Sequence, residues 1–258
     1  MRNKLLYILG AALMLLTACS TQVDEEDRLV YVKPAAVGKN VLIVDFTGQR
    51  CVNCPNATDI IEQLQKQYGP DTVVAVGMHS GPLGFKGNAR VLGLATDLGD
   101  TYYNYWNIEY QPQGVIDYLG KSDYLSWTGI VAAELQKTAP VDIKLTATTD
   151  GSAVSGKVTV SGIDGATTGK LQLWLVEDSI TAMQMMPDGS ANATYLHNHV
   201  FRAAINGDWG QDITVAEGAA ADVDYTLPLQ TAWVTKHLSV IAFVYNSTGV
   251  KQVVRKHL

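Results

Sequence analysis

The sequence predicts an α/β domain followed by an all-β sandwich, and three observations support this fold class. A β-branched apolar run at 41–44 leads into two cysteines, Cys51 and Cys54, and then into a helical pattern. Up to about residue 137, short apolar stretches alternate with amphipathic ones, which is typical of a sheet covered by helices. From Val141 onward, helical patterns nearly disappear and short alternating strands recur between turn signals.

The elements of the α/β half can be placed in order along the chain. After the first strand, a helix at 56–68 carries Ile60, Ile61 and Leu64 on one face, and Gly69-Pro70 ends it. Further elements are expected at 72–78 (strand), 88–106 (helix), 113–118 (strand) and 122–137 (helix).

The second half predicts strands alone. They are expected at 141–148, 156–161, 170–177, 199–204, 222–229, 238–245 and 250–254, separated by turns such as Asp164-Gly165. This spacing is typical of an immunoglobulin-like sandwich. Because no cysteine pair lies in this half, its apolar core must hold the sandwich together.

The N-terminus indicates export. Arg2 and Lys4 precede an apolar run at 5–16 that is too short to span a bilayer. The segment Leu16-Thr17-Ala18-Cys19 resembles a bacterial lipoprotein signal, which implies removal of residues 1–18 and lipidation of Cys19; an ordinary signal peptide is the alternative. No later stretch is long and apolar enough to span, so we expect attachment to the membrane through the lipid on Cys19.

Charge excludes one class of partner. The formal net charge is −6 and no basic block occurs, which argues against nucleic acid binding. The expected tether, residues 19–38, contains the acidic run Asp24-Glu25-Glu26-Asp27. Such a run is either a solvated linker or, by resemblance, an export tag for the outer cell surface.

The cysteine count limits the chemistry. With Cys19 lipidated, only Cys51 and Cys54 remain, and in an oxidising compartment they form either a disulfide or a dithiol. A zinc site would need two further ligands at metal spacing, so no metal and no cofactor is expected. His197 and His199 alternate on an expected strand and are read as partly exposed polar positions in preference to metal ligands.

The cysteine pair carries a family resemblance. A buried strand, a short turn and a Cys-x-x-Cys pair at a helix start resemble the thioredoxin superfamily, and Asp45 and Phe46 stand at matching positions before Cys51. Arg50 departs from the pattern, because the family usually has tryptophan there, as does the dipeptide Val52-Asn53 between the cysteines.

The same resemblance assigns expected roles. Cys51 would attack as a thiolate and Cys54 would resolve the mixed disulfide, while a buried Asp45 with a raised pKa would carry the proton. Pro112 stands where the family places a cis-proline against the cysteines, and the extra residues at 80–105 form an insertion that could cover or line the site. The alternative is a static disulfide that staples the start of the helix.

Nearly the whole chain resembles the twenty-eight-kilodalton outer-membrane lipoprotein family. The resemblance rests on Cys19, on Asp45 with the cysteine pair, and on the segment at 195–202. It implies an outer-membrane location and four parts: a signal peptide at 1–18, the tether at 19–38, a thioredoxin-like domain at 39–139 and a β-sandwich at 140–258.

Two functions follow from these patterns. The first is a lipid-anchored thiol–disulfide oxidoreductase acting on protein thiols and disulfides; the alternative is a surface binding or adhesion protein whose disulfide is structural. An aromatic cluster of Tyr102, Tyr103, Tyr105 and Trp106 bears on the choice. It is expected to form core and groove wall, or else a surface that binds peptide or glycan.

Overall fold

The computed structural model describes residues 32–258. The chain divides into two compact units, Met1–Lys33 and Pro34–Leu258, and every element below belongs to the second unit. The expected signal peptide, Cys19 and the acidic run lie outside the described residues.

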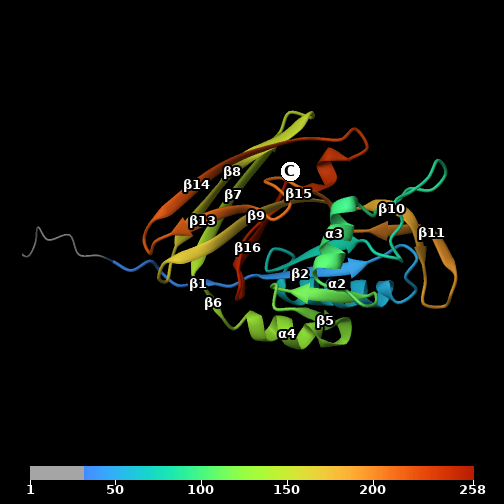
Figure 1. Ribbon diagram of the computed structural model, residues 1–258, viewed down its shortest axis with the longest axis horizontal. Coiled ribbons are helices and arrows are strands. Elements are labelled where there is room, and N and C mark those ends of the chain that lie inside the picture. The colour runs from blue at the N-terminus through green and yellow to red at the C-terminus, as the bar shows by residue number, and fades with distance from the viewer. Residues whose placement is uncertain (1–31) are drawn as a thin grey trace, which may run out of the picture. The chain divides into compact units, whose positions relative to one another are not determined.

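One nine-stranded sheet dominates the second unit (Figure 1). Its order is β16-β15-β9-β12-β3-β2-β4-β5, and β13 pairs with β9 beside this path. The strands are β2 Val41–Thr47, β3 Val73–His79, β4 Gln113–Ile116, β5 Lys121–Asp123, β9 Thr167–Glu177, β12 Val200–Ala204, β13 Gln211–Val215, β15 Leu238–Asn246 and β16 Gly249–His257.

Strand β12 joins the two halves of this sheet. Val200 lies opposite Gly77 of β3 in a parallel pairing and opposite Glu177 of β9 in an antiparallel one. The backbone N–H of Gly77 donates to the carbonyl of His199 at 2.8 Å. Strands from the early part of the chain therefore continue, through β12, into strands from the late part.

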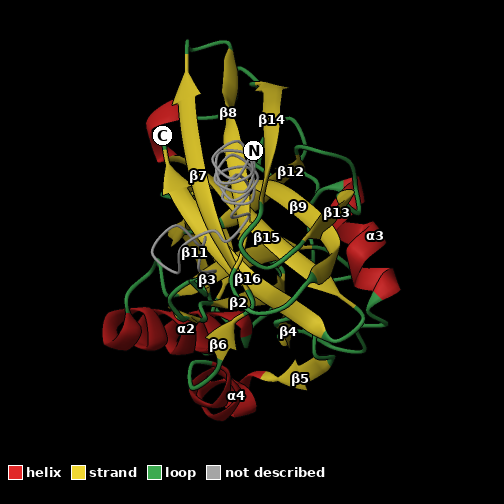
Figure 2. Ribbon diagram, turned by 90° about the vertical axis from the view of Figure 1, so that its left-hand side faces the viewer, coloured by secondary structure: helices red, strands yellow, loops and turns green. Residues whose placement is uncertain are grey.

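Helices cover one end of the sheet on both faces (Figure 2). Side chains alternate along β2, so Val41 and Ile43 face helices α2 (Cys54–Tyr68) and α4 (Trp127–Glu134), where Ile61 and Trp127 are buried. The opposite face packs against α3 (Asp97–Tyr105), whose residue Tyr102 is buried among core residues from both halves of the sheet.

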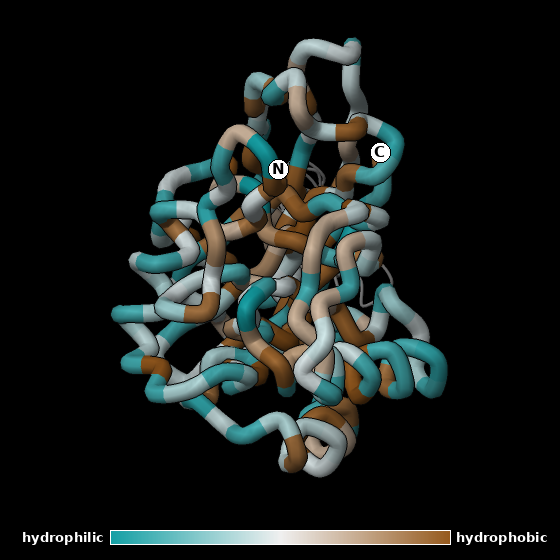
Figure 3. Tube along the Cα trace, turned by 90° about the vertical axis from the view of Figure 1, so that its right-hand side faces the viewer, coloured by the Kyte–Doolittle hydropathy of each residue, from teal (hydrophilic) through white to brown (hydrophobic). Residues whose placement is uncertain are grey.

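A second sheet covers the other end. Strands β7 (Val141–Thr149), β8 (Ala153–Gly162) and β14 (Ala220–Pro228) form a three-stranded antiparallel sheet in the order β14-β8-β7. Its apolar face packs against one face of β9 and β15, which makes a β-sandwich. Apolar segments run along these inner strands, and hydrophilic segments lie mainly in the outer loops and helical turns (Figure 3).

Two small sheets complete the described unit. Strand β1 (Val37–Gly38) pairs with β6 (Thr138–Ala139), and β10 (Ile180–Met185) pairs with β11 (Ala191–His197). We call the β10–β11 pair, residues 180–197, the hairpin arm. Short 3₁₀ turns lie at Tyr124–Ser126 and Thr235–His237.

The predicted fold class is wrong. An α/β thioredoxin-like domain followed by a separate sandwich would keep the sheets of the two halves apart, but the described chain is mainly β and its largest sheet takes strands from both halves. The predicted helix at 88–106 forms only over Asp97–Tyr105, where Thr96 caps it by accepting from the N–H of Gly99. Local patterns identified most elements, but the hydrogen bonding of β12 to both neighbours, which merges the halves, has no local signature.

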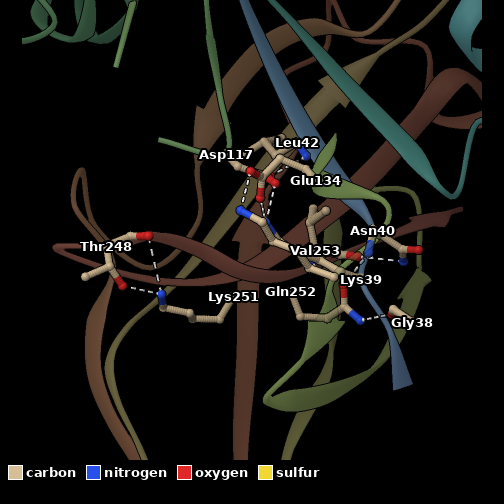
Figure 4. A network of polar contacts seen from close by, with 11 residues as sticks. Gly38, Lys39, Asn40, Leu42, Asp117, Glu134, Thr248, Lys251, Gln252 and Val253 are labelled. Carbon is tan, nitrogen blue, oxygen red and sulfur yellow. Dashed lines mark hydrogen bonds and ion pairs between the residues drawn. The ribbon is translucent and has the colours of Figure 1, made fainter. Parts of the chain in front are cut away.

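A buried ion cluster ties the start of β2 to the rest of the unit (Figure 4). The Lys39 ammonium lies 2.6 Å from a carboxylate oxygen of Asp117 and 2.6 Å from one of Glu134, and all three side chains are buried. The other oxygen of Asp117 accepts from the N–H of Leu42 at 2.8 Å. Burial raises the pKa of Asp117 to about 6, against the opposing effect of Lys39.

We predict that Lys39→Met destabilises the protein by about 3–5 kcal/mol at pH 7.5, because two buried carboxylates lose their cation. The folded pKa of Asp117 is raised, so this carboxyl weakens the fold as pH rises through the interval from 3.8 to about 6. The difference in unfolding free energy between wild type and Lys39→Met should therefore be smaller at pH 5, where Asp117 takes up a proton. Urea unfolding at both pH values measures the two deficits.

The matched control is Lys137→Met. Lys137 also binds Glu134, but its side chain is 56% exposed, so its loss should lower stability by less than about 1 kcal/mol. Equal deficits for the two variants would contradict the assigned role of Lys39.

Candidate functional site

The two cysteines lie at the start of α2 and are joined. Cys51 and Cys54 form a disulfide with a Cα–Cα distance of 5.4 Å, and each residue is only 1% exposed. Strand β2 delivers the chain to this turn, and Pro55 occupies the first turn of α2, where its missing N–H leaves no hydrogen bond unmade. The disulfide is thus held at a helix start and is shielded from solvent.

The hairpin arm provides much of that shielding. The side-chain amide of Gln184 donates to the carbonyl of Cys51 at 2.8 Å and to that of Gly48 at 3.3 Å. The backbone N–H of Met185 donates to the carbonyl of Gln49 at 2.9 Å. Gln184 is itself 1% exposed, so the arm is packed onto the turn that carries the cysteines.

Residues of the expected insertion at 80–105 also bind this turn. The N–H of Arg50 donates to the carbonyl of Leu83 at 3.1 Å, and the N–H of Leu94 donates to the side chain of Gln49 at 2.9 Å. The Arg50 guanidinium lies 4.8 Å from the ring centre of Phe85, an arrangement that favours a cation–π contact. Part of the expected insertion therefore lines the site, as its position in the sequence suggested.

A small enclosed cavity of about 30 Å³ lies beside Cys54, with room for a water molecule or two. Asp45 faces it from β2, between Gly77 of β3 and Gly114 of β4. Oδ1 of Asp45 has no hydrogen-bond partner within the protein. Burial raises the pKa of Asp45 to about 8, so its carboxyl is mostly protonated at neutral pH.

Two histidines line the same cavity. The rings of His79 and His197 meet edge to face at 5.1 Å, and Nδ1 of His79 and Nε2 of His197 lack partners within the protein. Burial lowers the pKa of His197 to about 4 and lowers that of His79 well below its usual value. The cavity therefore carries almost no charge at neutral pH. The prediction that His197 and His199 are partly exposed is wrong, because both are buried. The pairing of His197 with His79 was missed because the two residues come from different halves of the chain.

The expected strand bearing His197 and His199 is interrupted. His197 ends β11, whereas His199 lies in the turn before β12 with φ of 46° and donates its N–H to Asp178 at 2.6 Å. Within the described residues, no group of three or more histidine, cysteine, aspartate or glutamate side chains is placed to hold a metal ion.

The Gln111–Pro112 bond is cis, which confirms that part of the prediction for Pro112. The side chain of Gln111 donates to the carbonyls of Thr47 at 2.6 Å and Ser80 at 3.0 Å, which ties the turn to the ends of β2 and β3. Pro112 does not line the cavity beside Cys54. Its proposed role at the cysteines stays a prediction.

The aromatic cluster divides between core and surface. Tyr102 is buried and Tyr103 packs edge-on against Phe46. Tyr105 and Trp106 instead wall an open pocket together with Trp209 and Tyr245 from the second half, residues that the sequence analysis missed. Their separation in the sequence left no local signal for the pocket.

The matches to known proteins point to one family. The family model for outer membrane protein Omp28 matches residues 99–258. HBP35 of Porphyromonas gingivalis has a similar structure, with a TM-score of 0.67 and 18% identity over 88% of this chain and 77% of that chain. A domain of the outer membrane lipoprotein Omp28 from Porphyromonas gingivalis is 26% identical over 46% of this chain and 88% of that chain, with a TM-score of 0.36. No curated protein matches the sequence.

These matches define the class of protein. The family model spans more than half of the sequence, so the chain belongs to the Omp28 family of outer membrane proteins. The outer-membrane location and the resemblance to the twenty-eight-kilodalton outer-membrane lipoprotein family, both predicted from the sequence, are thereby confirmed. At 18% identity, the likeness to HBP35 shows a shared fold. No helix among residues 32–258 is both long and apolar enough to cross a membrane.

We predict that Asp45→Asn makes the protein more stable at neutral and alkaline pH. The folded pKa of Asp45 is about 8, against 3.8 for an aspartate in water, so wild-type stability falls as pH rises through this interval. Asparagine cannot ionise, and the gain of the variant over wild type should grow by roughly 4 kcal/mol between pH 4 and pH 7.

Urea unfolding of both proteins at several pH values measures this difference. The low pKa values of His79 and His197 affect both proteins alike, so the difference curve isolates Asp45. Parallel stability curves would show that Asp45 is ionised in the folded protein at neutral pH.

Proposed function

We propose that this protein is a binding protein of the outer membrane and that its Cys51–Cys54 disulfide is structural. The observation that carries the proposal is the seal over the disulfide by the hairpin arm, through Gln184 and Met185. Thiol–disulfide exchange requires a thiolate to reach a sulfur atom, and both sulfurs belong to residues that are 1% exposed.

The disulfide has a clear structural use in this position. It closes the short loop before α2. Closing a loop of this length stabilises a fold by about 2 kcal/mol, because it lowers the conformational entropy of the unfolded chain. The turn receives hydrogen bonds from the hairpin arm and from residues 83–94, so a fixed turn helps to position both. An open pocket at the junction of the two halves offers a place for a ligand.

The second candidate is a thiol–disulfide oxidoreductase acting on proteins. Asp45 beside Cys54 favours it, because a carboxyl with a pKa of about 8 can lose and regain a proton close to neutral pH. In the reduced protein, the Cys51 thiolate would attack a substrate disulfide, form a mixed disulfide and release one substrate thiolate. Asp45, as carboxylate, would take the proton of Cys54, whose sulfur would then attack Cys51 and release the second substrate thiol. The hairpin arm would have to open first, and Pro112 would border the exposed pair.

Cys54→Ala separates these two functions. It leaves Cys51 without its partner and would hold protein substrates of an oxidoreductase as mixed disulfides on Cys51. If the disulfide is structural, we expect Cys54→Ala to trap no proteins when thiols are blocked on whole cells. We also expect the reduction potential of the wild-type disulfide to lie below about −300 mV.

The control is the double variant Cys51→Ala/Cys54→Ala, which can trap nothing and should lose about 2 kcal/mol of stability. Proteins captured by Cys54→Ala and missing from the double variant would overturn the binding-protein proposal in favour of the oxidoreductase.

We propose lipidation of Cys19 as the means of attachment, which the family match to outer membrane proteins supports. Cys19→Ala should release the protein from membranes, since each acyl chain contributes about 0.8 kcal/mol per buried CH₂ group. Washing membranes with high salt and measuring the retained protein tests this prediction. Retention of the variant would rule out lipid as the anchor.

A further inference from the structure

An open pocket of about 550 Å³ lies where the two halves of the chain meet, within the size range of small-molecule sites. Tyr105 and Trp106 reach it from the end of α3, Trp209 from the loop between β12 and β13, and Tyr245 from β15. Tyr118, after β4, completes the aromatic wall. Tyr105 is 63% exposed, so aromatic surface is available to a ligand.

The rings of this pocket stand at steep angles to one another. Tyr105 and Trp209 lie 4.4 Å apart between ring centres at 52°, and Trp106 and Tyr118 lie 5.0 Å apart at 61°. Tyr118 also meets Tyr245 at 5.0 Å and 69°. Inclined rings present faces in several directions around the pocket, as a ligand with more than one apolar face requires.

Partly buried hydrogen bonds hold this aromatic wall in place. The hydroxyl of Tyr245 donates to the carbonyl of Trp209 at 2.8 Å, and the side chain of Gln172 donates to the carbonyl of Gly207 at 2.9 Å. The hydroxyl of Tyr102 donates to the carbonyl of Asp208. The loop that carries Trp209 is therefore fixed before any ligand arrives, which lowers the entropic penalty of binding.

Tyr118 is held by the ion cluster of Lys39. Asp117 and Tyr118 have φ values of 48° and 58°, a left-handed conformation that residues other than glycine rarely adopt. The contacts of Asp117 with Lys39 and with the N–H of Leu42 keep this backbone in place. Such conformations are retained mainly where the surrounding structure enforces them, often at ligand sites.

The polar rim of the pocket is electrically balanced. Lys170 and Asp212 are the charged residues that line it, and their side chains form an ion pair at 2.8 Å. The side chain of Lys170 is 41% exposed and that of Asp212 is 90% exposed, and Asn246 and Ser247 add neutral hydrogen-bonding groups. A charged ligand would find no unpaired opposite charge among these lining residues, whereas a neutral ligand with many hydroxyls would find both donors and acceptors.

We infer that this pocket binds a neutral saccharide. A pyranose ring has apolar C–H faces, which pack on aromatic rings, and a belt of hydroxyls, which each donate and accept hydrogen bonds. Tyr105 and Trp209 supply the aromatic faces for stacking. Lys170 donates hydrogen bonds to the sugar hydroxyls, and Asp212 accepts hydrogen bonds from them. The inference rests on the binding function proposed above and names its class of ligand.

The test is titration of the full-length protein with glucose, galactose, mannose and N-acetylglucosamine, and with maltose, cellobiose, lactose and chitobiose. Calorimetry and the tryptophan emission of the pocket report binding. We expect at least one of these sugars to bind with a Kd below about 10 mM. Affinity should change little between about 50 mM and 500 mM salt, because a neutral ligand is not screened.

Two matched variants locate the site. Tyr105→Ala removes a stacking face and should weaken binding about tenfold. Tyr110→Ala removes a tyrosine that is 46% exposed and lies outside the pocket, and it should leave the affinity unchanged. Because both residues are exposed, neither change should unfold the protein.

Three results would overturn the inference: no binding by any of these sugars, equal effects of the two variants, or binding of choline at this pocket in place of sugar. In the last case the protein would still be a binding protein, with a cation as ligand. Trapping of proteins by Cys54→Ala tests the proposed function separately, so either conclusion can fail alone.

Discussion

The pairing of β12 with both β9 and β3 is the constraint on which the described unit depends. Val200 bonds into two strands that are far apart in sequence, and this closes what would otherwise be an open edge on each half of the sheet. The shared core follows from it: Trp174 and Phe201 pack with Tyr102 and Met78 in one cluster. Neither half has a complete apolar core of its own at this junction.

The position of β12 also explains the state of the cysteines. The hairpin arm directly precedes β12, so anchoring that strand next to β3 brings the arm over the turn at Cys51. The same placement encloses Asp45 and His197 together, away from water. Burial then keeps the carboxyl protonated and the imidazole neutral, which avoids an unpaired buried charge beside the disulfide.

The aromatic pocket is a second product of this junction. Trp209 follows β12 and Tyr105 ends α3, and the shared sheet brings them within ring contact. The ion cluster of Lys39 also supports this pocket, because it holds Asp117 and thereby the backbone of Tyr118 in place. One side of the junction thus seals the disulfide, while another leaves aromatic surface open. The proposed binding at the pocket and the proposed structural role of the disulfide are compatible for this reason.

Most local elements and the family were predictable from the sequence alone. Periodicity placed the helix after Cys54 and the strands beside it, and the resemblance to thioredoxins implied a buried Asp45 with a raised pKa. The tertiary structure was needed to show that β12 merges the two expected halves, that the hairpin arm covers Cys51, and that Trp209 meets Tyr105. Periodicity in the sequence shows which face of a helix or strand is buried. Which element covers that face depends on contacts between residues more than a hundred positions apart, such as the pairing of Val200 with Gly77.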